Sequence, residues 1–248
     1  MNTIKKVIFL VLPLFFVACS SKKHSKTTTT DTTYITVNGF GESKKNGRHQ
    51  LFKEEYLILD SLQSTYQMFL EINSHRYQVY SLKSYRTDSK GQWTKILQLI
   101  NRLSGLREIS LYSDEITSVD FENHPKLRLL NIHSKNLPDT LVLPSEAKNL
   151  KNLILHSTNT KHIVFPENHY KIERMEISNS QMQYVDSSWA KLKKLEWLWL
   201  YNNQLQTFDI QLPKLELLYL FENPIKDTNL VKRNYPNTNI TFGRSADL

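Results

Sequence analysis

The sequence predicts an α/β-type solenoid, in which short parallel strands stack from structural units of about twenty residues. Two consecutive stretches with one apolar pattern support this prediction. The first has residues at positions 1, 4, 6, 9 and 11 as follows: Leu195, Leu198, Leu200, Asn203 and Leu205. The second has the same positions occupied by Leu215, Leu218, Leu220, Asn223 and Ile225. A unit this short cannot bury its apolar face alone, so neighbouring units are expected to stack.

Within each unit, positions 4 and 6 flank one outward residue, which is the alternation of a strand with one buried face. The Asn at position 9 can hydrogen-bond backbone groups where the chain bends out of the strand. This pattern resembles the leucine-rich repeat family, with the signature LxxLxLxxNxL, and bacterial leucine-rich repeat lipoproteins among its members. The resemblance implies a leucine-rich repeat solenoid with strands on a concave face and a mostly irregular convex side.

Four weaker copies precede these two, with first positions at Leu106, Leu127, Leu150 and Ile172. Six repeats are therefore predicted over residues 106–236. Three repeats have another residue instead of Asn at position 9, and we expect less regular bends there: Lys135, Thr158 and Ser180. If Asn237 is a further first position, Ile240 and Phe242 fall at positions 4 and 6. Residues 237–248 are thus predicted to form a C-terminal cap strand and tail.

Residues 34–105 are predicted to form an N-terminal capping region of mixed α and β structure, because an open solenoid end would expose apolar side chains. Residues 34–37 alternate as a strand, and the following Asn38-Gly39 is a hairpin signal. Residues 53–72 have helical spacing up to Phe69, although 55–59 could equally be a strand. Residues 77–82 indicate a strand, with Val79 and Leu82 as positions 1 and 4 of an irregular repeat. An amphipathic helix is predicted from Trp93 to Leu103.

The N-terminus has the features of an export signal. Two lysines precede an uncharged apolar run that ends at Cys19, the only cysteine of the chain. The join Phe16-Val17-Ala18-Cys19 resembles a bacterial lipobox, which implies a signal peptide over residues 1–19 and lipidation of Cys19. Residues 20–33 are polar and threonine-rich, as in a flexible tether. We therefore expect a protein lipid-anchored in a bacterial cell envelope, at an outer membrane by resemblance, with the membrane face left open.

The net charge of the chain and the motifs that it lacks bear on which classes of function are expected. The formal net charge is +8, which would raise nucleic acid as a partner, but export argues against nucleic acid. The chain has no phosphate-loop, nucleophile-elbow, zinc-protease or calcium-loop spacing, so no enzyme activity and no cofactor are predicted. His133 and His156 fall at neighbouring positions, but two imidazoles without a third ligand make a weak metal site. No metal site is predicted.

The strand residues between the buried leucines can bind a partner, because burial does not require them to be apolar. In the last two repeats, positions 3, 5 and 7 gather six large side chains, here named the aromatic surface: Trp197, Trp199, Tyr201, Leu217, Tyr219 and Phe221. Exposed aromatic clusters indicate binding sites, so a protein partner is predicted. Alternatively, the rings could stack on a glycan, with Glu176, Asn202 and Glu222 as nearby polar groups. In a third interpretation, residues 226–248 cover the aromatic surface, and the chain is a structural envelope protein without a specific ligand.

Position 2 carries charges that change sign along the array. We name this set the charge ladder: Arg107, Arg128, Lys151, Glu173, Glu196 and Glu216. Like charges on adjacent strands are modestly destabilising. Their segregation therefore suggests a bipolar face that orients a partner.

Overall fold

The computed structural model describes residues 34–38, 48–75, 78–84, 91–121, 123–166 and 170–243. The predicted signal peptide with Cys19, the tether and residues 244–248 lie outside the described residues. Within the described ranges, no helix is both long enough and apolar enough to cross a membrane.

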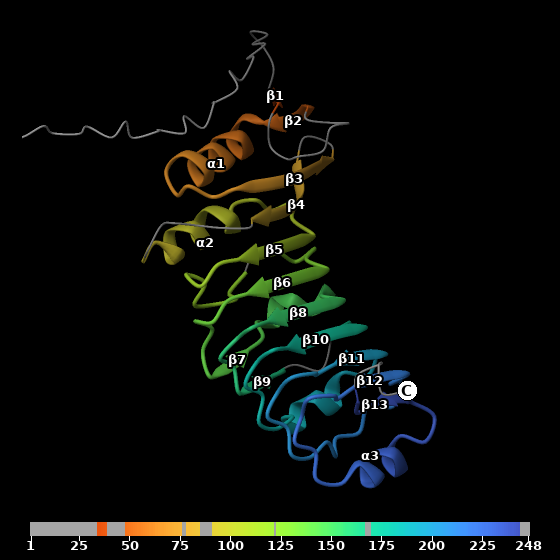
Figure 1. The fold of residues 1–248 in the computed structure, drawn as a ribbon. Helices are drawn as coiled ribbons and strands as arrows, with labels where there is room; N and C mark the ends of the chain where they lie inside the picture. Colours follow the sequence, from red (N-terminus) through yellow and green to blue (C-terminus); the bar gives the residue numbers. More distant parts are fainter. Residues whose placement is uncertain are drawn as a thin grey trace, which may run out of the picture.

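One nine-stranded sheet runs the length of the molecule, in the order β13-β12-β11-β10-β8-β6-β5-β4-β3 (Figure 1). Its strands are β3 (Leu70–His75), β4 (Gln78–Ser84), β5 (Glu108–Tyr112), β6 (Leu129–His133), β8 (Asn152–His156), β10 (Arg174–Ser178), β11 (Trp197–Trp199), β12 (Leu217–Tyr219) and β13 (Asn239–Thr241). All pairs from β4 to β13 are parallel. Within this sheet, only β3 pairs antiparallel, with β4.

The strand pairing follows the register predicted from the sequence. One row of Cα partners joins the residues at position 4 of successive strands: Leu82, Ile109, Leu130, Leu153, Met175, Leu198, Leu218 and Ile240. A one-residue slip would have turned these side chains to the other face of the sheet. Every strand from β4 to β13 keeps the same register, and this mostly parallel sheet fits the predicted leucine-rich repeat solenoid.

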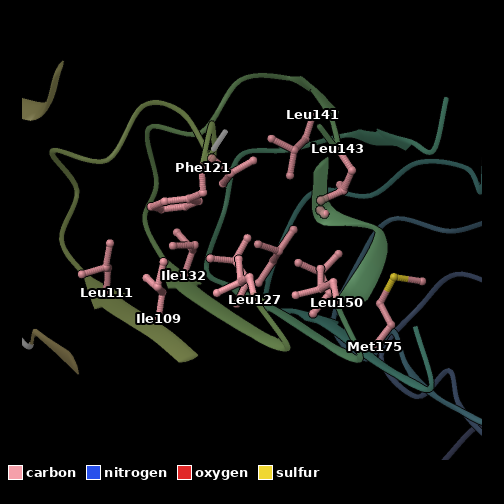
Figure 2. Close-up of a cluster of buried hydrophobic side chains, with 14 of the residues drawn as sticks. Ile109, Leu111, Phe121, Leu127, Ile132, Leu141, Leu143, Leu150 and Met175 are labelled. Atoms are coloured by element: carbon pink, nitrogen blue, oxygen red, sulfur yellow. The ribbon is translucent and has the colours of Figure 1, made fainter. Parts of the chain in front are cut away.

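The buried side of the sheet forms one continuous core. Leucine and isoleucine side chains from the strands pack against a second row that includes Phe121, Leu141 and Leu143 (Figure 2). The first-position residues are almost fully buried, from Leu106 at 0% exposed to Leu215 at 6%. Burial of this kind stabilises the fold by about 1.5–3 kcal/mol per large aliphatic side chain.

The side opposite the sheet has little regular structure. It contains β7 (Thr140–Val142) and β9 (His162–Val164), which pair in parallel. It also contains two short 3-10 helices, η1 (Ser145–Asn149) and η2 (Ser187–Lys191). The indole of Trp189 in η2 is fully buried and donates a hydrogen bond to the carbonyl of Ile163, at 2.7 Å. This contact ties η2 to β9 of the preceding repeat.

The bends after the strands of the last four repeats, β8, β10, β11 and β12, share one backbone conformation. Position 8 is left-handed there, with φ between 50° and 56°: Ser157, Asn179, Asn202 and Glu222. The expectation of irregular bends at Thr158 and Ser180 is therefore wrong. Ser180 Oγ donates to the carbonyl of Ser178 and accepts from the backbone N–H of Thr158, and in this way takes the place of an Asn. The first two repeats have no left-handed residue at position 8.

The N-terminal region adds a hairpin and two helices. β1 (Tyr34–Asn38) pairs antiparallel with β2 (Arg48–Phe52), and residues 39–47 lie outside the described ranges. The helices are α1 (Lys53–Ser64) and α2 (Trp93–Asn101), and their apolar residues join the core of the repeats. Glu55 of α1 is 6% exposed, and its carboxylate accepts a hydrogen bond from the N–H of Val79 at 2.5 Å. This bond links α1 to the start of β4.

Two sequence predictions for this region need correction. The helix predicted over residues 53–72 ends at Ser64, and the chain turns through Gln67, at φ 51°, into β3. Pairing of β3 with β4 satisfies the backbone groups that a longer helix would have used, and it leaves Phe69 58% exposed. The alternative of a strand at residues 55–59 is also wrong, because these residues lie within α1.

The C-terminal part contains α3 (Thr228–Asn234), shown beside β13 in Figure 1.

Candidate functional site

The strand face, defined as the side of the sheet that carries positions 3, 5 and 7, contains most of the candidate residues. Strand pairing sets Trp197 beside Leu217 and Trp199 beside Tyr219. All six members of the aromatic surface are half-buried, and none is fully covered. Residues 226–243 therefore do not bury this surface. The interpretation of a structural protein without a ligand required the C-terminal residues to cover it.

The rings of the aromatic surface stack on one another. Trp199 and Tyr219 are nearly parallel, with centroids 6.3 Å apart and 12° between the ring planes. Tyr201 and Phe221 stack more closely, at 4.8 Å and 4°. Trp197 meets Trp199 edge-on at 5.9 Å. These contacts restrict the side chains before any partner arrives, so binding would cost less conformational entropy.

Glu176 on β10 organises the polar part of the strand face. Its Oε1 accepts hydrogen bonds from the hydroxyl of Tyr201 at 2.9 Å and from Ser178 Oγ at 3.2 Å. His156 shares a hydrogen bond with Ser178 through Nδ1, at 2.6 Å, and its Nε2 lies 3.7 Å from Glu176 Oε1. Burial lowers the pKa of His156 and nearby His133 lowers it further, while the Glu176 carboxylate opposes the shift. Glu176 therefore holds Tyr201 directly and is linked to His156 through the hydroxyl of Ser178.

A hollow of about 260 Å³ opens on the strand face beside these residues. It is lined by residues of four neighbouring strands: Leu129, Asn152, Ile154, Arg174, Met175, Glu176 and Trp199. The guanidinium of Arg174 lies over the Trp197 ring, 4.1 Å from its centroid, which ties the hollow to the aromatic surface. The hollow thus combines apolar walls with one cation and one carboxylate.

Sequence reasoning missed part of this hollow. Leu129, Asn152 and Arg174 all occupy position 3, which the sequence analysis used only in the last two repeats. Applying the same position to every repeat would have found them. Of the three polar candidates for a glycan site, the structure places only Glu176 in the hollow. Asn202 and Glu222 lie at the bends after the strands, where both are exposed, and Asn202 donates a hydrogen bond to Asn179 Oδ1 at 2.7 Å.

The charge ladder forms a physical row at the start of the strands. Each member donates its backbone N–H to the carbonyl of the previous one, beginning with Arg128 to Arg107 at 2.7 Å and ending with Glu216 to Glu196 at 2.8 Å. The change of sign falls at a salt bridge between Lys151 Nζ and Glu173 Oε1, 2.6 Å long. The row lies at the edge of the strand face, one residue before position 3.

His133 and His156 are neighbours on paired strands, with ring centroids 6.5 Å apart. Within the described part of the chain, no group of three or more His, Cys, Asp or Glu side chains could hold a metal ion. His156 instead makes the contacts with Ser178 and Glu176 described above.

Comparison with known proteins gives matches among solved structures alone. No family model matches the chain. No curated protein matches it either. A leucine-rich repeat protein of Leptospira interrogans is similar over 58% of this chain and 57% of its own length, with 19% identity and a TM-score of 0.34. Internalin C2 of Listeria monocytogenes is similar over 77% of this chain and 92% of its own length, with 17% identity and a TM-score of 0.40.

The chain thus spans little more than half the length of the Leptospira protein. Both TM-scores lie below 0.5. Both of these solved structures are bacterial leucine-rich repeat proteins, the family that the repeat pattern of this chain resembles.

Proposed function

We propose that this chain is a non-enzymatic binding module that recognises a protein partner through its strand face. In this proposal the strand face is the concave side of the solenoid. The observation that carries the proposal is the hollow beside stacked, half-exposed rings. Tryptophan, tyrosine and arginine dominate the energetics of protein interfaces, and all three meet here. The aromatic surface would supply the anchors, and the hollow would accept one side chain of the partner.

The mixed charge of the hollow supports a protein partner. Arg174 and Glu176 stand two residues apart on β10 and face the same side, so a partner can place either sign of charge beside an opposite one. Leu129 and Ile154 add apolar wall, as in the core of a protein interface. The charge ladder would orient the partner along the array, and high salt would then slow association.

The proposed place of action is a bacterial cell envelope, with the chain lipid-anchored through Cys19 at an outer membrane. This part of the proposal is supported by the lipobox-like sequence and by the position of the single cysteine. One lipid chain gives only reversible membrane binding, so stable anchoring would need several acyl chains. Radiolabelled fatty acid incorporated by the wild type and lost in Cys19→Ser would support it, and equal labelling would refute it.

The binding proposal can be tested by affinity capture from envelope and host extracts with the full chain in a non-ionic detergent. The test variant is Trp199→Ala with Tyr219→Ala. The matched control is Phe69→Ala with Tyr184→Ala, which removes two exposed rings that belong neither to the aromatic surface nor to the lining of the hollow. A protein retained by the wild type and the control, and lost by the test variant, would support the proposal. A protein retained equally by all three would refute it.

Circular dichroism would show whether each variant is folded. If the aromatic double variant unfolds, Arg174→Ala supplies a second test, because Arg174 is exposed and lines the hollow. Capture that survives protease digestion of the extract but not glycosidase treatment would indicate a glycan instead of a protein.

A further inference from the structure

We propose that the chain has a second binding site, a basic groove at the start of strands β4 to β8 that takes an anionic oligosaccharide, sulfated or phosphorylated. This site lies at one edge of the sheet and is separate from the aromatic surface. Two hollows meet there, one of about 670 Å³ and one of about 360 Å³. They share Arg107 and Lys126 as lining residues, so they form one groove.

The positive charge of the groove comes from two rows of residues. Position 2 contributes Arg107, Arg128 and Lys151, whose backbones are hydrogen-bonded in sequence across adjacent strands. The position before each repeat contributes Lys126 and Lys171. Neighbouring strands stand roughly 4.8 Å apart, so the cations of one row are closely spaced.

Most of this charge is not neutralised by the protein. Among the described residues, Arg107, Lys126 and Arg128 have no carboxylate within salt-bridge distance, whereas Lys151 pairs with Glu173. In the second half of the array, Lys194 and Lys214 each precede a glutamate of the charge ladder by two residues, so the two rows offset each other. Of these two rows, it is therefore the part in the groove that keeps unbalanced positive charge.

Gly105 helps to form the larger hollow. It occupies the position where the following repeats have Lys126 or Asn149. A Cβ at Gly105 would lie only 2.9 Å from the carbonyl oxygen of Val79 and 3.0 Å from the Cβ of Gln78. The glycine thus lets the chain pass close to β4, and no side chain fills the space between Gln78 and Lys126.

The lining favours a sugar over an acidic peptide. Beside the cations, the larger hollow is lined by neutral hydrogen-bonding groups of Ser74, Gln78 and Tyr80, which suit hydroxyl groups. No aliphatic side chain lines either hollow, although a bound peptide needs apolar pockets for its side chains. Strands β4 to β8 are paired on both sides, so none offers a free edge for an added strand.

The lining also disfavours a membrane surface. A flat bilayer cannot fill a groove, and the exposed large apolar residues of the described chain lie outside it, at Leu57, Phe69, Val142, Tyr184 and Leu230. Both hollows have volumes within the roughly 300–1,000 Å³ of small-ligand sites. A short, anionic and hydroxyl-rich oligosaccharide matches this combination of charge, polarity and volume.

The test is a binding titration with a fluorescent, heparin-derived octasaccharide, followed by anisotropy, on the full chain in a non-ionic detergent. The variant Arg107→Gln with Lys126→Gln should weaken binding about tenfold or more, because two charge-assisted contacts are lost. The matched control, Lys194→Gln with Lys214→Gln, removes the same net charge from outside the groove and should stay within about twofold of the wild type. All four side chains are exposed, and thermal melts would confirm that both variants fold.

Four results would overturn the proposal. Equal weakening by both double variants would show an effect of net charge only. Equal binding of the desulfated octasaccharide would remove the role of the anionic groups. Polyglutamate that binds as tightly, with the same loss in the groove variant, would replace the sugar by an acidic peptide. Phosphatidylglycerol in mixed micelles with the detergent, giving the same result, would replace it by a lipid headgroup. The aromatic double variant should leave the titration unchanged, so failure here is distinguishable from failure of the proposed protein-binding function.

Discussion

The side chain of Asn203 joins two repeats, and replacing it should destabilise both. Its Nδ2 donates to the carbonyls of Ile177, Leu200 and Tyr201, at 2.7, 2.9 and 3.2 Å. Its Oδ1 accepts from the N–H of Met182, at 3.1 Å. The residue is 2% exposed, so water cannot replace these partners without opening the bend. Each of these hydrogen bonds contributes a net of about 0.5–1.5 kcal/mol to stability. Asn203→Ala should therefore lower the free energy of unfolding by about 3 kcal/mol.

Urea unfolding would measure this loss, and hydrogen exchange at the Met182 amide would locate it. Gln204→Ala is the matched control, because its amide side chain is exposed and it should change the free energy by no more than about 0.5 kcal/mol. Asn203→Ser should recover part of the loss, since Ser180 fills the equivalent position in the preceding repeat. A change below about 1 kcal/mol in Asn203→Ala, or an unaltered Met182 amide, would refute the reasoning.

Three further predictions concern the core and its ionisable groups. Leu198→Ala, at a fully buried position 4, should cost about 2–5 kcal/mol and open the last repeats together, and hydrogen exchange unchanged in β10 to β12 would contradict this. Glu55→Ala leaves the Val79 N–H without its acceptor and should cost about 1–3 kcal/mol in thermal unfolding, whereas Glu54→Ala, at the exposed neighbour, should cost much less. Burial lowers the pKa of His124 to about 4, so its contribution to stability is complete above pH 6.5 and is lost as the pH falls towards 4. This amounts to about 3 kcal/mol, and an acid titration of stability that keeps the same slope in His124→Leu would show another group to be responsible.

Much of the fold could be predicted because its contacts repeat at a fixed distance along the chain. The row from Leu82 to Ile240 follows directly from the spacing of apolar residues. The helix end at Ser64 could not be predicted this way, because pairing of β3 with β4 overrides the helical spacing that continues to Phe69. The bend at Ser180 also differs from its prediction, because a serine hydroxyl can replace an asparagine amide when the preceding repeat supplies the donor, here the N–H of Thr158.

The candidate sites, like the fold, could be predicted from the sequence only in part. The sequence by itself determined the repeat period, the strand register and the columns that hold the aromatic surface and the charge ladder, since these depend on which residues alternate within one strand. Only the tertiary structure decided that Leu129, Arg174 and Trp199 share one hollow, that Glu176 holds Tyr201, and that Gly105 leaves a groove beside Arg107 and Lys126. These features depend on side chains from different repeats meeting in space, and no single repeat contains that information.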